Sequence, residues 1–580
     1  MKFLKPYIRK YWKLFGLAVF FLMIEAICDL LQPTIMAKII DDGVANREMS
    51  VVLQQGGLML MITLFGALTA SLRSVISSRV SQRFGAELRA DLFRKIQRLS
   101  FENMDQFDRA SLVTRLTNDV TQVQNFVNGL MRIFVKAPLI CIGSLIMAVR
   151  LNMQLSVVLI VVVPLVALFI FLNMKIGFPF FVKVQQALDK VNGVMREYLS
   201  GVRVVKAFNR FDVEVDKFEQ ANEGLQSRST TAMRVMSVFS PQIVLTVNLG
   251  IIAVLWIGGL RVDQGQIQVG HIIAFINYMT QILFSLMMIS MIFNMFVRAK
   301  ASAERIGEVF QSWNAMTWDS SAESEPDQRG RIEFDNVTFA YAGTSGDPVL
   351  KQLSFHCAPG QMIGIIGSTG SGKSSLVHLI PRFYDVTSGT VSVNGVDVRQ
   401  MDPHKLRETI AIVPQKTVLF SGSVLENIQY GKEDATQEEI EAAARIAEAH
   451  DFIAESPEGY HSRIGQGGVN FSRGQRQRLS IARALVRKPD ILILDDCTSA
   501  VDVATESRIK AGLKQYAASL TCLLIAQRIT SVMDADQIIV LEDGVIVGQG
   551  THQELMVDCA VYQEIFQSQL GKEMNQYAAK

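Results

Sequence analysis

Six apolar segments of the chain are each long enough to cross a lipid bilayer as a helix, and all six lie before residue 310. They cover residues 14–38, 53–73, 130–149, 154–178, 241–260 and 271–297. Because a helix needs roughly 20 apolar residues to span the hydrocarbon core, this pattern predicts a six-helix membrane bundle. The first segment is too long for the apolar part of a signal peptide, so we interpret it as a permanent span.

Lysine and arginine near the segment ends predict how the bundle is oriented. Five of these residues lie within residues 2–13, and Arg298, Lys300 and Arg305 follow the last segment, whereas the connections expected on the opposite side are short and poor in such charge. By the positive-inside rule, the N-terminus and everything after the sixth span are cytosolic, in a multi-pass protein of the cell membrane. Long polar stretches with helical periodicity after spans two and four predict helices that extend into the cytosol.

The sequence changes character after the sixth span. Residues 311–330 are polar and acidic and contain Pro326 and Gly330, which is typical of a linker. Beyond them, short β-branched runs alternate with helical segments, which predicts an α/β domain. We therefore expect a membrane domain over 1–310, a linker over 311–330 and an α/β domain over 331–575. The net charge of +2 over 580 residues excludes the basic field of a dedicated nucleic-acid binder.

A phosphate-binding loop follows the first apolar strand of this second domain. The segment Gly367–Ser374 reads GSTGSGKS and fits GxxxxGK[ST] between the strand 362–366 and a helix. Its glycines let backbone N–H groups surround phosphates, while Lys373 reaches the outer phosphates and Ser374 binds Mg²⁺. The predicted cofactors are ATP and Mg²⁺. The nucleotide-binding residues predicted here are Gly367, Ser368, Thr369, Gly370, Ser371, Gly372, Lys373 and Ser374.

A second motif lies near the apolar strand 491–494, which ends in Asp495 and Asp496, a pattern typical of a carboxylate that binds Mg²⁺ beside a phosphate loop. The preceding segment 470–484 reads NFSRGQRQRLSIARA and resembles the ABC transporter signature. Gln415, Tyr341 and the run SAVD that ends at Asp502 complete the ordered set. Together with the six spans, the chain resembles an ABC exporter half-transporter of the multidrug type with the type IV exporter fold.

The resemblance implies roles for residues on the phosphate-loop side. Tyr341 stacks on the adenine, and Gly367 to Ser375 wrap the phosphates. Gln415 contacts Mg²⁺ and relays the nucleotide state to the membrane helices. Asp495 anchors Mg²⁺ together with Ser374.

Other residues are expected, by the same resemblance, to act between subunits. Ser472, Gly474 and Gln475 face the γ-phosphate held by a second subunit, and Asp502 communicates between the two sites. Segments 101–107 and 204–211 are expected to form the coupling helices that contact the nucleotide domains.

Three positions depart from the family pattern. Asp496 stands where the family has the glutamate that polarises the attacking water, and Gln527 stands where it has a histidine. A carboxylate that is one methylene shorter sits about 1 Å too far back, and such misplacement costs about 10²-fold in rate. Arg473 replaces a usual glycine. The pattern favours a heterodimer whose partner, a related half-transporter, supplies the intact glutamate and histidine; the alternative is a homodimer that tolerates both replacements.

Two features of the spans bear on the cargo. Glu25 and Asp29 lie on one face of the first helix, where carboxylates are costly and therefore candidates for substrate binding. The alternative is that they pair with basic groups inside the bundle. Met287, Met291 and Met295 form a flexible apolar stripe suited to adaptable binding, or alternatively to packing or lipid contact. At the outer end of the first span, Asp41 and Asp42 either repel like charges across an outward gate or cap a helix.

The leading hypothesis is one subunit of a heterodimeric exporter that moves hydrophobic or amphipathic compounds, with multidrug efflux as one option. Its partners are then the second half-transporter chain, membrane lipid and a small-molecule substrate. The same architecture also fits a lipid or peptide exporter. A further alternative is an ATP-gated regulatory or sensing subunit that transports nothing.

Overall fold

The computed structural model describes residues 2–313, 316, 329–342, 346–516 and 520–577. Their contacts divide the chain into two compact units. The membrane unit holds residues 1–97 and 109–312, and the nucleotide unit holds residues 98–108 together with 313–580. Most of the predicted linker 311–330 lies outside the described residues. The short segment 98–108 is therefore inserted between two helices of the membrane unit but packs with the nucleotide domain.

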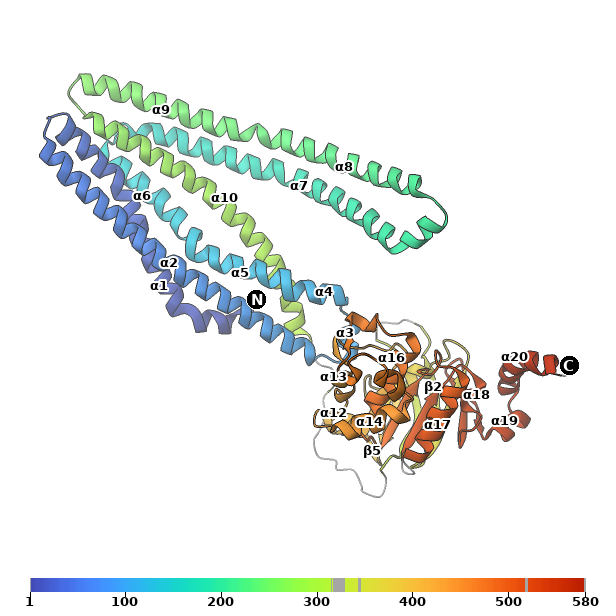
Figure 1. The fold of residues 1–580 in the computed structure, drawn as a ribbon. Coiled ribbons are helices and arrows are strands. Elements are labelled where there is room, and N and C mark those ends of the chain that lie inside the picture. Colours follow the sequence, from blue (N-terminus) through green and yellow to red (C-terminus); the bar gives the residue numbers. More distant parts are fainter. Residues whose placement is uncertain (1, 314–315, 317–328, 343–345, 517–519, 578–580) are drawn as a thin grey trace. The chain divides into compact units, whose positions relative to one another are not determined.

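The membrane unit is built from long helices (Figure 1). They are α1 (Lys5–Lys38), α2 (Met49–Gln97), α4 (Arg109–Thr114), α5 (Val120–Gly129), α6 (Lys136–Leu151), α7 (Ser156–Ala207), α8 (Phe211–Ser237), α9 (Phe239–Asp263) and α10 (Val269–Gln311). Three π-helical turns, η2 (Ile39–Val44), η3 (Arg115–Asp119) and η4 (Leu130–Phe134), continue neighbouring helices. Among the described residues, 6 helical stretches are long and apolar enough to cross a membrane. The predicted six-helix bundle is thereby confirmed.

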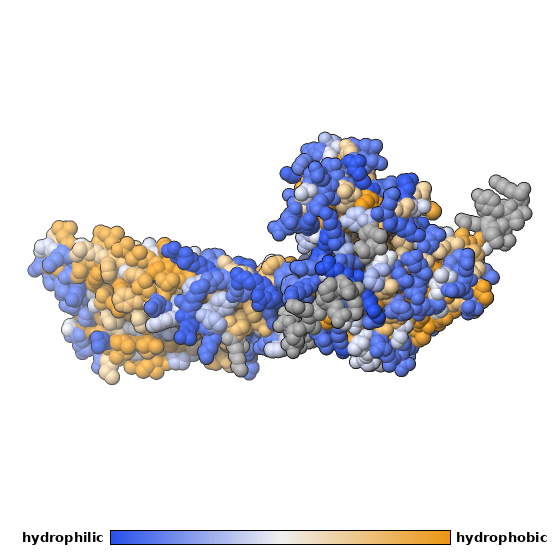
Figure 2. All heavy atoms as spheres, turned by 90° about the horizontal axis from the view of Figure 1, so that it is seen from below, coloured by the Kyte–Doolittle hydropathy of each residue, from blue (hydrophilic) through white to orange (hydrophobic). Residues whose placement is uncertain are grey.

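The surface of the membrane unit is largely apolar, as lipid contact requires. Broad apolar areas cover the left-hand part of Figure 2, where this unit lies. Ile160 is 71% exposed and Trp256 is 73% exposed. Large side chains such as Phe275 and Tyr278, both fully buried, fill the interior. Because lipid tails are as apolar as these side chains, close packing and internal polar bonds hold such helices together more than the hydrophobic effect does.

Buried polar contacts fix the helix ends of the membrane unit. At one end, the backbone N–H of Gly270 donates to Asp41 Oδ1 at 2.6 Å. Asp41, in the turn η2 that follows α1, thus caps the start of α10, which favours the capping role over the gate role for this residue. Farther along α10, Arg305 forms an ion pair with the fully buried Asp119, and Ser302 donates to the same carboxylate at 2.8 Å. These bonds join α10 to η3.

The described residues of the nucleotide unit form three sheets. A 6-stranded sheet has the order β12-β11-β3-β10-β9-β6, a 4-stranded sheet has the order β2-β1-β4-β5, and β7 pairs with β8. The strands are β1 (Ile332–Phe339), β2 (Leu350–Cys357), β3 (Met362–Gly367), β4 (Ser388–Val393), β5 (Val396–Asp397), β6 (Ile410–Val413), β7 (Gly422–Ser423), β8 (Arg463–Ile464), β9 (Ile491–Asp495), β10 (Thr521–Ile525), β11 (Gln537–Glu542) and β12 (Val545–Gly550). In the larger sheet β11, β3, β10, β9 and β6 run parallel.

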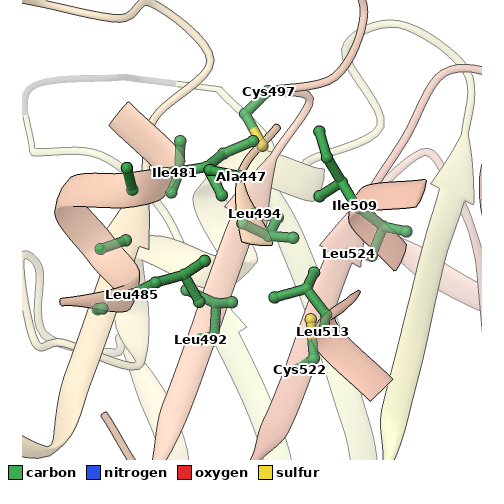
Figure 3. Packing of buried hydrophobic residues seen from close by; sticks show 14 of the residues in the cluster. Ala447, Ile481, Leu485, Leu492, Leu494, Cys497, Ile509, Leu513, Cys522 and Leu524 are labelled. Atoms are coloured by element: carbon green, nitrogen blue, oxygen red, sulfur yellow. The ribbon is translucent and has the colours of Figure 1, made fainter. Parts of the chain in front are cut away.

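Helices lie between these strands in the chain and after the last of them. They are α11 (Lys373–Leu379), α12 (Pro403–Thr409), α13 (Val424–Gln429), α14 (Gln437–Ile446), α15 (His450–Ala454), α16 (Arg473–Leu485), α17 (Val503–Tyr516), α18 (Ile529–Val532), α19 (His552–Asp558) and α20 (Ala560–Tyr577). Figure 3 shows Ile481 and Leu485 of α16 and Ile509 and Leu513 of α17 against β9 and β10. Because these strands are buried on both faces, they are continuously apolar rather than alternating. The parallel register places the carboxyl ends of β3 and β9 at one edge, where the candidate site lies.

Candidate functional site

The phosphate loop follows β3 and turns directly into α11. Gly370 and Gly372 have φ values of +88° and +95°, in the left-handed region that favours glycine. A Cβ on Gly372 would also lie 2.6 Å from Leu350 Cδ2. The loop can therefore present consecutive N–H groups only if these positions lack side chains. Because α11 begins at Lys373, its N-terminal N–H groups and dipole point at the same place, which suits an anion.

Lys373 lies across the loop that it is predicted to serve. Its ammonium group donates to the carbonyl oxygens of Gly367 at 2.8 Å and Ser368 at 2.7 Å. Burial lowers the pKa of Lys373, while the nearby carboxylates of Asp495 and Asp496 act in the opposite direction. A cation that is partly desolvated and held by neutral carbonyls gains strongly from an added phosphate.

Ser374 and Asp495 form the candidate metal site. Ser374 Oγ donates to Asp495 Oδ1 at 3.1 Å, and Asp495 is 3% exposed. Burial raises the pKa of Asp495, with repulsion from Asp496 in the same direction and the Ser374 bond opposed to it. A hydroxyl and a carboxylate oxygen this close match the hard oxygen ligands that Mg²⁺ prefers. The divalent charge would relieve the burial penalty on the carboxylate, so these two residues fit the ion.

The two replacements in the family pattern meet at one oxygen atom. Asp496 Oδ2 accepts a hydrogen bond from Gln527 Nε2 at 2.8 Å and another from Gln415 Nε2 at 3.1 Å. Asp496 is 7% exposed and has a φ of +47°. The structure thus brings Asp496, Gln527 and Gln415 together. Their convergence on one oxygen could not be predicted from the sequence, because the three residues lie on separate loops.

Tyr341 reaches the loop from the other side. Its hydroxyl shares a hydrogen bond of 2.9 Å with Ser375 Oγ, and its ring packs at 4.8 Å from Phe339 and 5.1 Å from Tyr384. Tyr341 thereby lies beside the residues predicted to wrap the phosphates. Tyr384 was missed by sequence reasoning; the aromatic pair Phe383-Tyr384 shortly after α11 was the signal that could have found it.

The signature residues cap a different helix. Ser472 is the N-cap of α16 and forms a reciprocal capping box with Gln475, at 3.2 Å and 2.9 Å. A Cβ on Gly474 would lie 2.9 Å from the carbonyl oxygen of Ala500. Arg473 is exposed at the first turn. In the described part of the chain, the side chains of Ser472 and Gln475 each accept from the backbone N–H of the other residue, and neither bonds to the phosphate loop.

Asp502 caps the neighbouring helix α17. Its side chain accepts from the backbone N–H of Thr505 at 2.9 Å, and the bonds to Thr505 lower the pKa of Asp502. Gln477 of α16 accepts from the N–H of Ala500 at 3.1 Å, which ties the signature helix to the loop before Asp502. The signature residues and Asp502 thus form one connected surface.

The charged candidates of the first span are paired inside the membrane unit. Glu25 accepts from Arg73 Nε at 2.7 Å and from Lys136 Nζ at 2.6 Å, while Lys136 also contacts Asp29 at 2.9 Å. Glu25 is 7% exposed. Two carboxylates and two cations neutralise each other across α1, α2 and the start of α6. These contacts support the alternative that Glu25 and Asp29 pair with basic groups inside the bundle, rather than the one in which their carboxylates bind a substrate.

Two of the three candidate methionines line a small apolar cavity. It has a volume of about 60 Å³ and lies between α5, η4 and α10. Met291 is 66% exposed, and Met295 approaches Gly129 so closely that a Cβ there would lie 2.5 Å from its sulfur. Met287 is 48% exposed and lies outside this cavity. The lining residues are Phe126, Gly129, Leu130, Ile133, Phe134, Met291, Ile292 and Met295.

A P-loop ATPase domain with an adjoining signature helix, on a chain with six membrane-spanning helices, defines an ATP-driven membrane transporter. Residues 15–287 match the ABC transporter transmembrane region, and residues 350–499 match the ABC transporter nucleotide domain. The chain belongs to the ABC transporter family. It is a half-transporter of the exporter type, its ABC domain is a transport ATPase that binds ATP, and it is a multi-pass membrane protein.

Known proteins align along almost the whole chain. It is 40% identical over 575 residues to the ABC transporter ATP-binding protein YfiB of Bacillus subtilis, covering 99% of this chain and 98% of that one. It is 34% identical over 511 residues to a fatty acid ABC transporter ATP-binding/permease protein of Mycobacterium bovis, covering 88% and 80%. In fold, it is similar to a bacterial Atm1-family ABC exporter with ATP bound, with a TM-score of 0.79, 24% identity, and 97% and 98% coverage.

Proposed function

We propose that this chain is the subunit of a heterodimeric exporter whose own phosphate loop binds Mg-ATP but hydrolyses it slowly. The observation that carries the proposal is the arrangement around Asp496. The oxygen that would take a proton from water already accepts hydrogen bonds from Gln527 and Gln415. The carboxylate is also one methylene shorter than the glutamate it replaces, and Gln527 carries no titratable proton.

In this proposal the signature side of the chain completes a competent site on the partner. Ser472, Gly474 and Gln475 match the family pattern, and the capping box holds them in a fixed geometry. The partner is a related half-transporter that carries the intact glutamate and histidine. Several relatives can coexist in one organism, since YfiB and YfiC of Bacillus subtilis are 40% and 31% identical to this chain.

The proposed domain boundaries are 1–310, 311–330 and 331–575, with the N-terminus and the nucleotide domain in the cytosol. Residues 98–108 already lie on this chain's nucleotide domain. The second coupling segment, 204–211, remains exposed, with Phe208 74% and Phe211 42% accessible. We expect it to contact the partner's nucleotide domain, so that ATP-driven closure acts on both membrane units and hydrolysis at the partner's site resets them.

The proposed cargo is a hydrophobic or amphipathic compound. The apolar cavity beside Met291 and Met295 suits an alkyl or aromatic group, whereas the charges around Glu25 are already neutralised within the bundle. A relative at 34% identity is named a fatty acid transporter, which favours a lipid-like cargo as the second candidate. Multidrug efflux is the broader form of the same proposal.

The test compares the purified chain alone with the chain co-purified with its partner, both in lipid vesicles. We expect turnover by the single chain to be about 10²-fold below that of the pair, and we expect only the pair to move a fluorescent amphipathic substrate. Robust hydrolysis by this chain as a homodimer would contradict the heterodimer. A pair that hydrolyses ATP but transports none of a panel of drugs, lipids and peptides would favour the regulatory alternative.

A further inference from the structure

Tyr341, the candidate adenine-stacking residue, packs against a second tyrosine, Tyr384. The rings of Tyr341 and Tyr384 meet edge to face, with centroids 5.1 Å apart and an angle of 86°. Both also pack on Phe339. This edge-to-face geometry is the favourable one for aromatic rings, so a displacement of one ring changes the contact energy of the other.

Tyr384 in turn holds the segment 98–108. Its hydroxyl donates to Asp105 Oδ2 at 2.7 Å, and its ring lies 6.3 Å from that of Phe101, which also stacks at 4.5 Å on Phe383. Burial, together with the bond to Asp105, raises the pKa of Tyr384, so the phenol keeps its proton and remains the donor. A hydrogen bond to a charged acceptor is among the stronger contacts available to a half-exposed helix.

Polar contacts hold the loop that carries Tyr384. Arg382, which is 2% exposed, forms an ion pair with Asp385 at 2.7 Å. Arg407 donates to the Arg382 carbonyl at 2.9 Å and lies 5.5 Å from the Phe383 ring. Because these contacts hold the residues on both sides of Tyr384, we expect a change at Tyr341 to reach residues 98–108 mainly through the tyrosine side chain.

We propose that Tyr384 is a positioning residue that couples adenine binding at Tyr341 to the segment 98–108 through its bond to Asp105. The link is separate from Gln415, which faces the Asp496 carboxylate on the phosphate side. Base stacking on Tyr341 restricts its ring, fixes the contact with Tyr384 and strengthens the hold on Asp105. The inference rests on the proposed role of Tyr341 and adds a base-dependent signal to the phosphate-dependent one.

Hydrogen exchange of the backbone amides in residues 98–108, measured on the full-length chain in nanodiscs, tests the link. We expect saturating Mg-ATP to slow exchange there by about tenfold, the scale of one charge-assisted hydrogen bond. Tyr384→Phe keeps both rings in contact but should reduce the nucleotide effect to less than about twofold, and Asp105→Asn should do the same. The matched control is Tyr516→Phe, which removes a phenol bonded to the Leu485 carbonyl and should leave the effect intact.

The nucleotide-dependent difference separates coupling from a structural role, since a hydroxyl that only stabilises the helix would change exchange equally with and without nucleotide. Mg-tripolyphosphate, which lacks a base, should occupy the loop without protecting 98–108. Equal protection by tripolyphosphate, or an unchanged ATP effect in Tyr384→Phe, would overturn the link. Tyr341→Ala tests the underlying assumption separately: if it leaves the preference for ATP over tripolyphosphate unchanged, the stacking role itself is wrong.

Discussion

The two surfaces through which this chain takes part in ATP binding differ in how their polar groups are satisfied. On the phosphate-loop side, Lys373 bonds to the loop carbonyls, Ser374 bonds to Asp495, and Asp496 accepts from two amides. On the signature side, the side chains of Ser472 and Gln475 each accept from the backbone N–H of the other residue and so form a helix cap. The polar groups of the first surface are bonded across several loops of one chain, whereas in the proposed heterodimer the second surface completes a site on the partner.

The two surfaces also differ in how the sequence departs from the family pattern. Both replacements that we propose to slow hydrolysis, Asp496 and Gln527, fall on the phosphate-loop side. The signature side differs only at Arg473, whose side chain is exposed. If each surface serves a different ATP molecule, variants on the two sides should affect different sites of the assembled pair, and the following predictions test that separation.

The largest effect is expected from Lys373→Ala. Lys373 supplies the charge that meets the outer phosphates, and its loss removes about two charge-assisted hydrogen bonds, or about 10³-fold in Mg-ATP affinity at this chain's loop. Nucleotide titration of the single chain measures that loss. In the pair, the partner's loop should still bind one ATP with unchanged affinity. Loss of both sites would contradict the separation.

The second-largest expected effect is an increase in the rate of ATP hydrolysis. Asp496→Glu combined with Gln527→His restores the longer carboxylate and a titratable partner beside it. Because the present carboxylate is set back by about 1 Å, we expect single-turnover hydrolysis at this site to rise by about 10²-fold. The reaction is best measured in a pair whose partner site carries an inactivating change. Asp496→Glu alone is the matched control, and no gain in either variant would locate the defect elsewhere in the pocket.

Much of this arrangement was predictable from sequence, and the reasons differ by residue. The spans and the Lys373 loop were predictable because hydrophobic length and glycine spacing are local properties. The convergence of Gln415 and Gln527 on Asp496 was not, since it depends on how the ends of parallel strands meet. The charge of Glu25 indicated a costly buried group, but its partners Arg73 and Lys136 are far away in sequence.

The segment 98–108 shows the same limit. Its aromatic character suggested a contact, and Phe101 does pack on the nucleotide unit. The pairing of this segment with Phe383 and Tyr384 could not be predicted, because Tyr384 follows Asp105 by 279 residues in the chain. The segment 204–211 has similar composition but remains exposed in the described structure, so composition alone does not distinguish a contact within the chain from one that needs another chain.

A smaller effect is expected on the signature side. Ser472→Ala removes the cap of α16, which costs about 1 kcal/mol in stability. In the proposed heterodimer it also removes a hydroxyl that would face the phosphate bound by the partner. We expect about tenfold slower turnover of the pair, with Mg-ATP affinity at this chain's own loop unchanged. Thr436→Ala, which removes the equivalent capping box of α14, controls for the stability loss. Equal slowing by both variants would show that only the cap matters.

The smallest effect concerns pH and again belongs to the phosphate-loop side. Burial lowers the pKa of His378 at the end of α11, with Asp495 opposing the shift. The unfolded chain therefore binds this proton more readily than the folded one, so stability is full above the ordinary histidine pKa of about 6.5 and falls as pH drops below it. His378→Gln should remove that part of the pH dependence. The melting temperatures of the wild type and the variant are compared between pH 7 and pH 5, an interval of about 2 units that spans this pKa. The two temperatures should converge at the acidic end, and an equal dependence on pH would show that His378 does not contribute.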